Sequence, residues 1–361
     1  MIGAGLAGAA VTHALARRGW QITLLDAASG PAAAASALPV GMLSPHITRS
    51  PTPLSRLTAL GVPLTRAELQ RLVAPGHGWC PTEVDNLDHD PGRHDAALVR
   101  PGALVRAWLA EATDLGRLQT RWGHPVSALV PNAGGGWTAR GADGQPLASA
   151  PVAVVAAALG SRDLLEAAAL PLRPVRGQMS LGDAADIGAP TAERPQRRDG
   201  VFVPVYRDAG LPTWPAGLWS VGSTFERGAT DTAVRDSDHA LNRERLQAID
   251  PQAAAAFDRS WAAGRVAGWA QVRCASLDRL PLVGAAPASA AGDPRAPLDA
   301  WPRAQGLYLL TALGSRGLSL AAWCSQRLAE AIDGAPVQTP QDLWRALDPA
   351  RFAWRARRRV G

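Results

Sequence analysis

The 361-residue sequence contains no lysine, and all 37 of its basic residues are arginine. A chain without lysine cannot form a Schiff base through a lysine amine, anchor pyridoxal phosphate or carry the lysine of a P-loop. Cysteine is scarce as well, since only Cys80, Cys274 and Cys324 occur, far apart and never in a Cys-x-x-Cys spacing. This pattern excludes a disulfide framework and a thiolate-rich zinc site.

Further classes of protein are disfavoured by what the chain lacks. His77, Cys80, His89 and His94 share one segment, but their spacing matches no standard metal site, so we expect no metal. The longest apolar runs fall well short of the roughly 18 residues needed to span a bilayer. The N-terminus has no basic region ahead of an apolar stretch and no small-residue cleavage site, which predicts a cytoplasmic enzyme.

Length and charge set the broad class. A chain of 361 residues exceeds the usual size of a single core, so we expect two lobes. The net charge of +6 is carried by arginine alone. Because the planar guanidinium binds both oxygens of a carboxylate or phosphate, this surface indicates an anionic substrate or partner.

The N-terminal residues have the pattern of a βαβ unit. Met1 and Ile2 form a strand stub, a helix runs to about Arg18 with Gly19 as its stop, and a strand follows over residues 21–25. Between the stub and the helix lies a Gly-x-Gly-x-x-Gly turn made by Gly3, Ala4, Gly5, Leu6, Ala7 and Gly8. Because the first glycine almost follows Met1, we expect a very short central strand unless the native chain begins upstream.

This turn predicts a dinucleotide site. Its glycines allow a tight turn, close approach of a pyrophosphate and contact of helix with strand, and the helix N-terminus supplies free N–H groups. Asp26 lies eighteen positions after Gly8 and is placed to bind ribose hydroxyls. An ordinary glycine turn is the alternative.

A second glycine-rich helix start lies near the other end of the chain. A strand over residues 306–311 leads into Gly314-Ser315-Arg316-Gly317 and a helix over residues 318–332. A helix N-terminus of this kind can face the pyrimidine end of a flavin and stabilise the charge of its reduced form, which favours FAD over NAD. A plain helix cap is the alternative.

The remaining elements complete the expected fold. We expect helices over 54–72 and 101–112, a loop over 74–93, strands over 126–130 and 152–158, and a polar tail over 341–359. Short alternating segments after Arg173, such as 200–206 and 217–223, predict an antiparallel sheet. The fold class is therefore α/β, with a Rossmann-type FAD-binding domain over 1–60, 95–172 and 265–361. An antiparallel-sheet substrate lobe takes 61–94 and 173–264.

Three segments carry a family resemblance: residues 221–228, 272–284 and 347–352. They resemble the D-amino-acid and glycine oxidase (DAO) family of flavoenzymes, and within it the oxidoreductase domain of the bifunctional MnmC enzymes that modify the wobble uridine of tRNA. The resemblance implies an FAD-dependent oxidation of a secondary amine. The carboxymethylaminomethyl group of the uridine would become aminomethyl, with release of glyoxylate. It also implies tRNA as a partner and, because the family's methyltransferase half is missing here, possible cooperation with a separate methyltransferase.

The same resemblance implies particular site residues. Arg273 and Arg316 match the substrate-carboxylate arginines of the glycine oxidase group, with solvated surface charges as the alternative. Tyr206 is a third catalytic candidate, or else a packed aromatic. Gly177 lines the junction of the lobes or is a turn glycine. The expected flavin contacts beyond the first turn are Ala35, Ser36, Gly41, Met42, Val126, Gly160, Gly314, Ser315, Arg316, Gly317 and Leu318.

The C-terminal tail and three rival functions stay open at this point. Arginines interleave with aromatics in a pattern suited to RNA phosphates, or else form a solvated basic tail: Arg351, Phe352, Trp354, Arg355, Arg357, Arg358 and Arg359. The rivals are a free glycine-, sarcosine- or D-amino-acid oxidase, an inactive domain that binds FAD or tRNA, and, more remotely, an NAD-dependent dehydrogenase.

Overall fold

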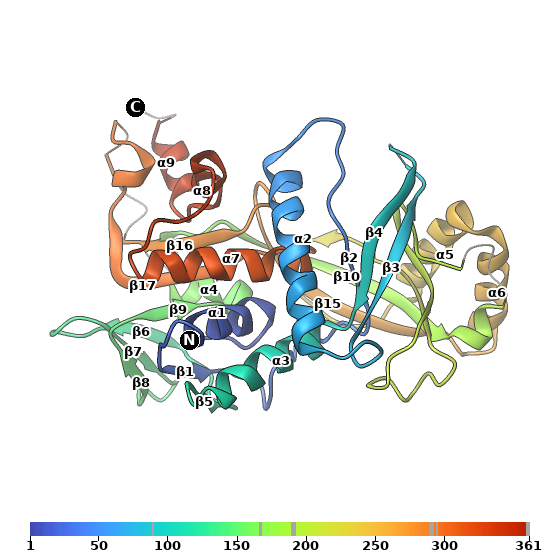
Figure 1. Ribbon diagram of the computed structural model, residues 1–361, viewed down its shortest axis with the longest axis horizontal. Helices are drawn as coiled ribbons and strands as arrows, with labels where there is room; N and C mark the ends of the chain where they lie inside the picture. The colour runs from blue at the N-terminus through green and yellow to red at the C-terminus, as the bar shows by residue number, and fades with distance from the viewer. Residues whose placement is uncertain (89, 166–167, 189–192, 289–291, 294, 359–361) are drawn as a thin grey trace. The chain divides into compact units, whose positions relative to one another are not determined.

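The computed structural model describes residues 1–88, 90–165, 168–188, 193–288, 292–293 and 295–358, so His89 and Arg359 lie outside the described residues. The chain forms two compact units (Figure 1). Unit 1 comprises Met1–Ser36, Val105–Arg173 and Cys274–Gly361, and unit 2 comprises Ala37–Leu104 and Pro174–Arg273. Residues 37–60, 95–104 and 265–273, which we expected in the FAD-binding domain, belong to unit 2.

Unit 1 is built on a mainly parallel sheet. Its strands, in spatial order around Ile2, are β5 (Leu118–Arg121), β1 (Ile22–Leu25), β9 (Ala153–Val155), β17 (Arg303–Thr311) and β16 (Leu282–Pro287). Ile2 forms parallel bridges to Leu25 and Val155 and so takes the central place in the sheet. Only β16 runs antiparallel. This arrangement confirms the Rossmann-type fold.

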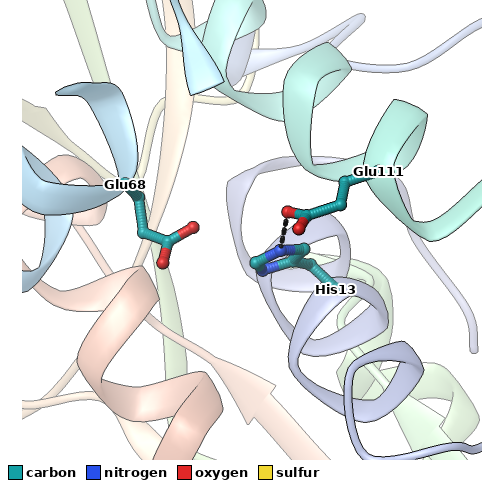
Figure 2. Close-up of side chains that lie close together, drawn as sticks. All are labelled: His13, Glu68 and Glu111. Atoms are coloured by element: carbon teal, nitrogen blue, oxygen red, sulfur yellow. Dashed lines mark hydrogen bonds and ion pairs between the residues drawn. The ribbon is translucent and has the colours of Figure 1, made fainter. Parts of the chain in front are cut away.

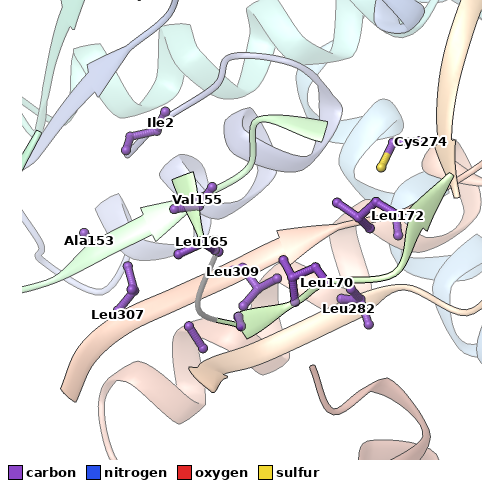
Figure 3. Packing of buried hydrophobic residues seen from close by; sticks show 13 residues of the cluster. Ile2, Ala153, Val155, Leu165, Leu170, Leu172, Cys274, Leu282, Leu307 and Leu309 are labelled. Carbon is purple, nitrogen blue, oxygen red and sulfur yellow. The ribbon is translucent and has the colours of Figure 1, made fainter. Parts of the chain in front are cut away.

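The core of unit 1 lies around this sheet. Val155, Leu282 and Leu309 are fully buried and pack with Ile2 and Cys274 in one cluster (Figure 3). The continuous apolar run expected at 152–158 supplies β9, because a strand covered on both faces needs no polar alternation.

Helices and a small hairpin sheet complete unit 1. The helices are α1 (Leu6–Ala16), most of α3 (Pro101–Asp114), α4 (Ser161–Leu164), α7 (Gly317–Ile332), α8 (Gln341–Leu347) and α9 (Arg351–Arg358). The hairpin sheet is β6 (Ala128–Pro131), β7 (Trp137–Arg140) and β8 (Pro146–Ala150). The tail expected to be merely polar is therefore largely helical. None of the described helices is long and apolar enough to cross a bilayer.

Unit 2 is built on a mainly antiparallel sheet, as predicted for the substrate lobe. Its order is β14 (Glu226–Arg227), β10 (Leu172–Asp183), β13 (Leu218–Gly222), β12 (Gly200–Tyr206), β11 (Gln196–Arg198), β3 (Trp79–Asn86), β4 (Gly92–Val99) and β2 (Gly41–Leu43). A further strand, β15 (Ala267–Ser276), pairs with β10. Among the strand pairs that the structure describes in unit 2, only β11 and β3 run parallel.

One expectation for unit 2 needs correction. The loop predicted over 74–93 is wrong, because β3 and the start of β4 form a long hairpin there. Its exposed positions carry charged side chains and proline, which hid the strand pattern in the sequence. The helix expected over 54–72 is confirmed as α2 (Pro53–Leu72), while α5 (Asp236–Ile249) and α6 (Pro251–Ala262) had no counterpart in the sequence analysis.

The C-terminal helix of unit 1 is fixed by a buried arginine. Arg351 is 1% exposed, and its Nη2 and Nε donate to Asp278 at 2.7 and 3.0 Å. The same guanidinium donates to three or more backbone carbonyls, including those of Leu280 and Leu347. Burial opposes ionisation of Asp278, but the Arg351 guanidinium keeps the pKa of that carboxyl below its usual value. The expectation that Arg351 grips RNA is therefore wrong, because this side chain is buried and saturated.

We expect Arg351→Met to lower the free energy of unfolding by about 2–4 kcal/mol, because it leaves Asp278 and several carbonyls without their donor. Arg355→Met on the same helix is the matched control. Its side chain is 48% exposed, and its Nη1 is as far as 3.4 Å from the same carboxylate. The loss in the free energy of unfolding should therefore stay below about 1 kcal/mol. Urea unfolding of both variants measures the difference, and equal stabilities would contradict the assignment.

Candidate cofactor and substrate sites

The outer glycines of the N-terminal turn are required by packing. A Cβ on Gly3, whose φ is +100°, would lie 2.5 Å from the carbonyl oxygen of Ala156. A Cβ on Gly8 would lie 1.7 Å from the carbonyl oxygen of Gly3. Real side chains never approach so closely, so both positions need glycine for the helix to meet the sheet.

Gly5 differs from these two glycines because the space beside it is open. It is the N-cap of α1, and a Cβ there would meet only Ser36 Oγ, at 3.2 Å. The Leu6 amide donates to this hydroxyl at 3.0 Å. The amides of Ala7 and Gly8 have no partner among the described residues. The start of α1 can therefore accept an anion at its free amides.

Asp26 holds the same turn from the end of β1. Its Oδ2 accepts from the Ala4 amide at 2.6 Å and its Oδ1 accepts from the Ala28 amide at 2.8 Å. The residue is only half-buried. A carboxylate fixed at this edge of the sheet has the place that the sequence analysis assigned to a ribose ligand.

The two glycine-rich helix starts lie side by side within unit 1 (Figure 1). A Cβ on Gly317, the first residue of α7, would lie 3.0 Å from Leu6 Cδ1 at the start of α1. At the other end, Asp333 accepts from Arg18 Nη1 at 2.6 Å and from Trp20 Nε1 at 2.8 Å. The helices therefore run parallel, and the positive ends of both dipoles lie on the same side of the unit.

The loop before α7 is hydrogen-bonded to the end of β15, where the last segment of unit 1 begins at Cys274. Gly314 adopts a φ of +57°, and its amide donates to the carbonyl oxygen of Cys274 at 2.9 Å. Ala275 and Leu313 form an antiparallel bridge beside it. Arg316 follows as the N-cap residue of α7 and is half-buried.

The other expected flavin contacts fall in different places. Ala35 and Ser36 form a short 3-10 turn, and Ser36 is joined to the start of α1 as described. Gly160 ends another 3-10 turn, and Val126 packs against the unit 1 core. Gly41 and Met42 belong to β2 of unit 2. The structure thus brings together the first turn, Asp26, Ser36 and the α7 start.

A part-buried contact between His13 and Glu111 joins α1 to α3. His13 Nε2 and Glu111 Oε2 lie 2.6 Å apart, joining α1 to α3 (Figure 2). The His13 ring stacks on Trp108 with 6.2 Å between ring centroids. These contacts fix the helix whose N-terminus forms the candidate cofactor site.

Arg273 in unit 2 is a desolvated cation without a carboxylate partner. Its Nη2 donates to Ser223 Oγ, and its Cζ lies 4.6 Å from the centroid of the Phe225 ring. Among the described residues no acidic side chain lies within ion-pair distance, and Nη1 is buried without a hydrogen-bond partner. Burial lowers the pKa of the guanidinium to about 10, so it stays charged at neutral pH. An anion such as a carboxylate would complete this site.

Gly177 makes room for that guanidinium. A Cβ on Gly177 would lie 2.2 Å from Arg273 Nη2 and 2.6 Å from the Thr224 carbonyl oxygen. The residue lies within β10 and not in a turn. Its glycine is therefore explained by the close approach of Arg273 to the strand.

Tyr206 lies in the unit 2 core. It is 1% exposed and packs with Val203 and Leu218. Its hydroxyl donates to Asp208 at 2.9 Å, and Asp208 also accepts from Arg100 Nε at 2.7 Å. Burial and the neighbouring Asp208 raise the pKa of the phenol, which stays protonated. This placement favours the packed-aromatic alternative over a substrate ligand.

Sequence reasoning assigned no role to Ser223 or Phe225, the neighbours of Arg273. They lie about fifty positions before it, and only strand pairing brings them together. The segment stood out only through its family resemblance, and no local pattern indicated these contacts.

Known proteins resemble this chain over nearly its whole length. A family model described as FAD dependent oxidoreductase (DAO) matches residues 1–93 and 92–331. The tRNA 5-methylaminomethyl-2-thiouridine biosynthesis bifunctional protein MnmC of Verminephrobacter eiseniae is 36% identical over 98% of this chain. That alignment covers 63% of the relative, so the chain spans less than two thirds of its length.

Solved structures share the fold. Glycine oxidase from Geobacillus kaustophilus superposes with a TM-score of 0.70 at 16% identity, covering 97% of each chain. Iminodiacetate oxidase from Chelativorans sp. BNC1 gives 0.68 at 19% identity, covering 94% of this chain and 96% of that one. With the parallel sheet, the glycine turn and the family model in agreement, this chain belongs to the FAD dependent oxidoreductase (DAO) family.

Proposed function

We propose that this chain uses FAD to oxidise the carboxymethylaminomethyl group of the wobble uridine in tRNA, yielding aminomethyl-uridine and glyoxylate. The observation that carries the proposal is Arg273, a half-buried residue whose Nη1 is buried and unpartnered and which has no acidic neighbour among the described residues. Such a group suits the carboxylate of an N-substituted glycine. The name of the MnmC relative supplies the tRNA context.

The residues of unit 1 fit FAD. The free amides of Ala7 and Gly8, at the open start of α1, would hold the pyrophosphate, and Asp26 would bind the ribose. The start of α7, from Gly317, would face the pyrimidine edge of the flavin. When bound, FAD supplies the two-electron acceptor that takes hydride from the substrate methylene carbon.

The chain's own part in the reaction is positioning. The substrate amine must be unprotonated, so that its lone pair forms a C=N bond as hydride leaves the methylene carbon that carries the carboxylate. Water then adds to this bond, the C–N bond breaks, and glyoxylate and the primary amine are released. We propose that Arg273 holds the carboxylate so that the methylene is correctly placed. No side-chain acid or base is strictly required.

We propose tRNA as the macromolecular partner, through the exposed side of α9. Arg355, Arg357 and Arg358 are all exposed, and the Arg358 guanidinium lies 4.8 Å from the Trp354 ring. Exposed guanidinium groups beside an aromatic side chain suit RNA phosphates and bases. We further propose a cytoplasmic location and, as another partner, a methyltransferase that completes the methylaminomethyl group.

Gly5→Ala should weaken FAD binding by about tenfold or more while leaving the fold intact, because its Cβ would press only on the Ser36 hydroxyl, at 3.2 Å, next to the free amides. Gly8→Ala should instead destabilise the protein by about 3 kcal/mol or more, since its Cβ overlaps the Gly3 carbonyl. Gly30→Ala, with nothing within 4 Å, is the control. Flavin titration and thermal unfolding separate the effects, and equal behaviour of all three variants would refute the site.

Anaerobic mixing of the flavin-loaded protein with tRNA carrying carboxymethylaminomethyl-uridine should bleach the flavin and release glyoxylate. Arg273→Met should raise the KM for this tRNA by about 30-fold or more while bound flavin is retained, because the substrate carboxylate loses its partner. Arg265→Met, at a guanidinium of the same unit that is 54% exposed, should change nothing.

Other results of the same assay would select a rival function. Turnover of glycine or sarcosine comparable with that of the tRNA would favour a small-molecule oxidase. A purified protein without flavin, or one whose flavin no substrate reduces, would favour an inactive binding domain. Unchanged kinetics in Arg273→Met would refute the carboxylate anchor.

Replacing Arg355, Arg357 and Arg358 together by Gln should weaken tRNA binding and flatten its salt dependence. Each phosphate contact to a single strand contributes about 0.7 to the slope of log K against log salt, so the slope should fall by about 2. Filter binding at several salt concentrations measures this change. An unaltered slope would show that α9 does not contact the RNA.

A further inference from the structure

Phe225 is an exposed aromatic side chain placed directly on the Arg273 guanidinium. It is 58% exposed, the highest value among the large apolar side chains that the structure describes. The Arg273 Cζ lies 4.6 Å from its ring centroid. A single exposed aromatic side chain is common on protein surfaces, but this one lies against a guanidinium whose Nη1 has no hydrogen-bond partner among the described residues, and that pairing points to a ligand.

Hydrogen bonds fix the chain segment that carries this ring. Gly222 pairs with Met179 of β10 and Glu226 pairs with Arg176, so three residues of one chain segment face two of the other. The bulge is locked by Thr224, whose amide donates to the Gln178 carbonyl at 3.1 Å. Its Oγ1 accepts from the Gln178 amide at 2.9 Å. A bulge can re-aim a side chain, and Phe225 is the residue of this segment whose large apolar side chain is exposed.

The substrate has an aromatic ring at a matching separation from its carboxylate. In an N-carboxymethylaminomethyl uracil, four single bonds join the carboxylate carbon to the pyrimidine, a reach on the order of 5 Å. The Phe225 ring lies at a similar distance from the Arg273 guanidinium. A substrate whose carboxylate is held by Arg273 can therefore lay its pyrimidine on the exposed part of the Phe225 ring.

We propose that Phe225 is a stacking platform for the pyrimidine base and thereby determines the specificity of this site for a modified nucleoside over a free amino acid. The inference rests on the proposed function, because it takes the carboxylate anchor at Arg273 as given. Proteins that recognise single-stranded RNA commonly stack an unstacked base on an aromatic side chain. Glycine and sarcosine have no ring and gain nothing from this platform.

The test compares two substrates that share the N-substituted glycine group. The free nucleoside carboxymethylaminomethyl-uridine carries the base, and sarcosine does not. Under anaerobic conditions, flavin bleaching gives the KM of each for the wild-type holoenzyme and for three variants, Phe225→Ala, Phe225→Trp and Val234→Ala. Val234 is 49% exposed in the same unit and serves as the matched control.

We expect Phe225→Ala to raise the KM for the nucleoside by about 5- to 150-fold, the range for removal of a base–aromatic stack, and to leave sarcosine unchanged. Phe225→Trp should preserve or lower the nucleoside KM, and Val234→Ala should behave as wild type. Equal losses for both substrates in Phe225→Ala would show that the ring acts only by placing Arg273, which overturns the proposal. A wild-type enzyme that binds nucleoside no better than sarcosine would overturn it too.

A different result would refute the proposed function. If the wild-type holoenzyme leaves the modified tRNA unoxidised, the tRNA activity is refuted whatever the variants do. If the tRNA is oxidised equally well by wild type and Phe225→Ala, the function stands and the stacking platform is refuted. Flavin content and melting temperature, measured for every variant, show that each comparison is made on folded protein.

Discussion

The parallel packing of α1 against α7 is the constraint on which the cofactor site depends. Contact at Gly317 and Leu6 brings the two N-termini together, and Asp333 binds the residues beyond the end of α1. The free amides of Ala7 and Gly8 in α1 and the positive dipole ends of both helices, from segments three hundred residues apart, thus face the same side of unit 1. Glycine at position 8 is needed for this arrangement, because any side chain there would displace the helix from the turn.

In this lysine-free chain, desolvated arginines that have an acidic partner stabilise the fold. Arg273, which has no such partner among the described residues, is proposed to bind a ligand. Arg176 is fully buried and lies 2.6 Å from Asp238, and Arg351 is fixed by Asp278 in the same way. Arg273 has no acidic partner among the described residues, and desolvation lowers the pKa of its guanidinium. An uncompensated buried charge is costly to the fold, so a protein that keeps one at such a position is suited to an anionic ligand.

Local patterns predicted the fold where secondary structure and burial agree. The strand over 200–206 matches β12, and the helix start after Gly314 matches α7 within one residue. The hairpin of β3 and β4 was not predicted, because the residues at its exposed positions are typical of a loop. Long-range pairing explains the rest of the differences. The burial of Arg351 by Asp278 and the contact of Phe225 with Arg273 each join positions about fifty or more residues apart, which no sequence periodicity encodes.

The central claim is that both glycine-lined helix starts hold one flavin, and a crystal structure of the FAD-loaded protein tests it most directly. The account predicts pyrophosphate oxygens at hydrogen-bond distance from the amides of Ala7 and Gly8, and the pyrimidine carbonyl of the same flavin at the first turn of α7. A flavin bound elsewhere, or one that touches only one of the two helix starts, would contradict it.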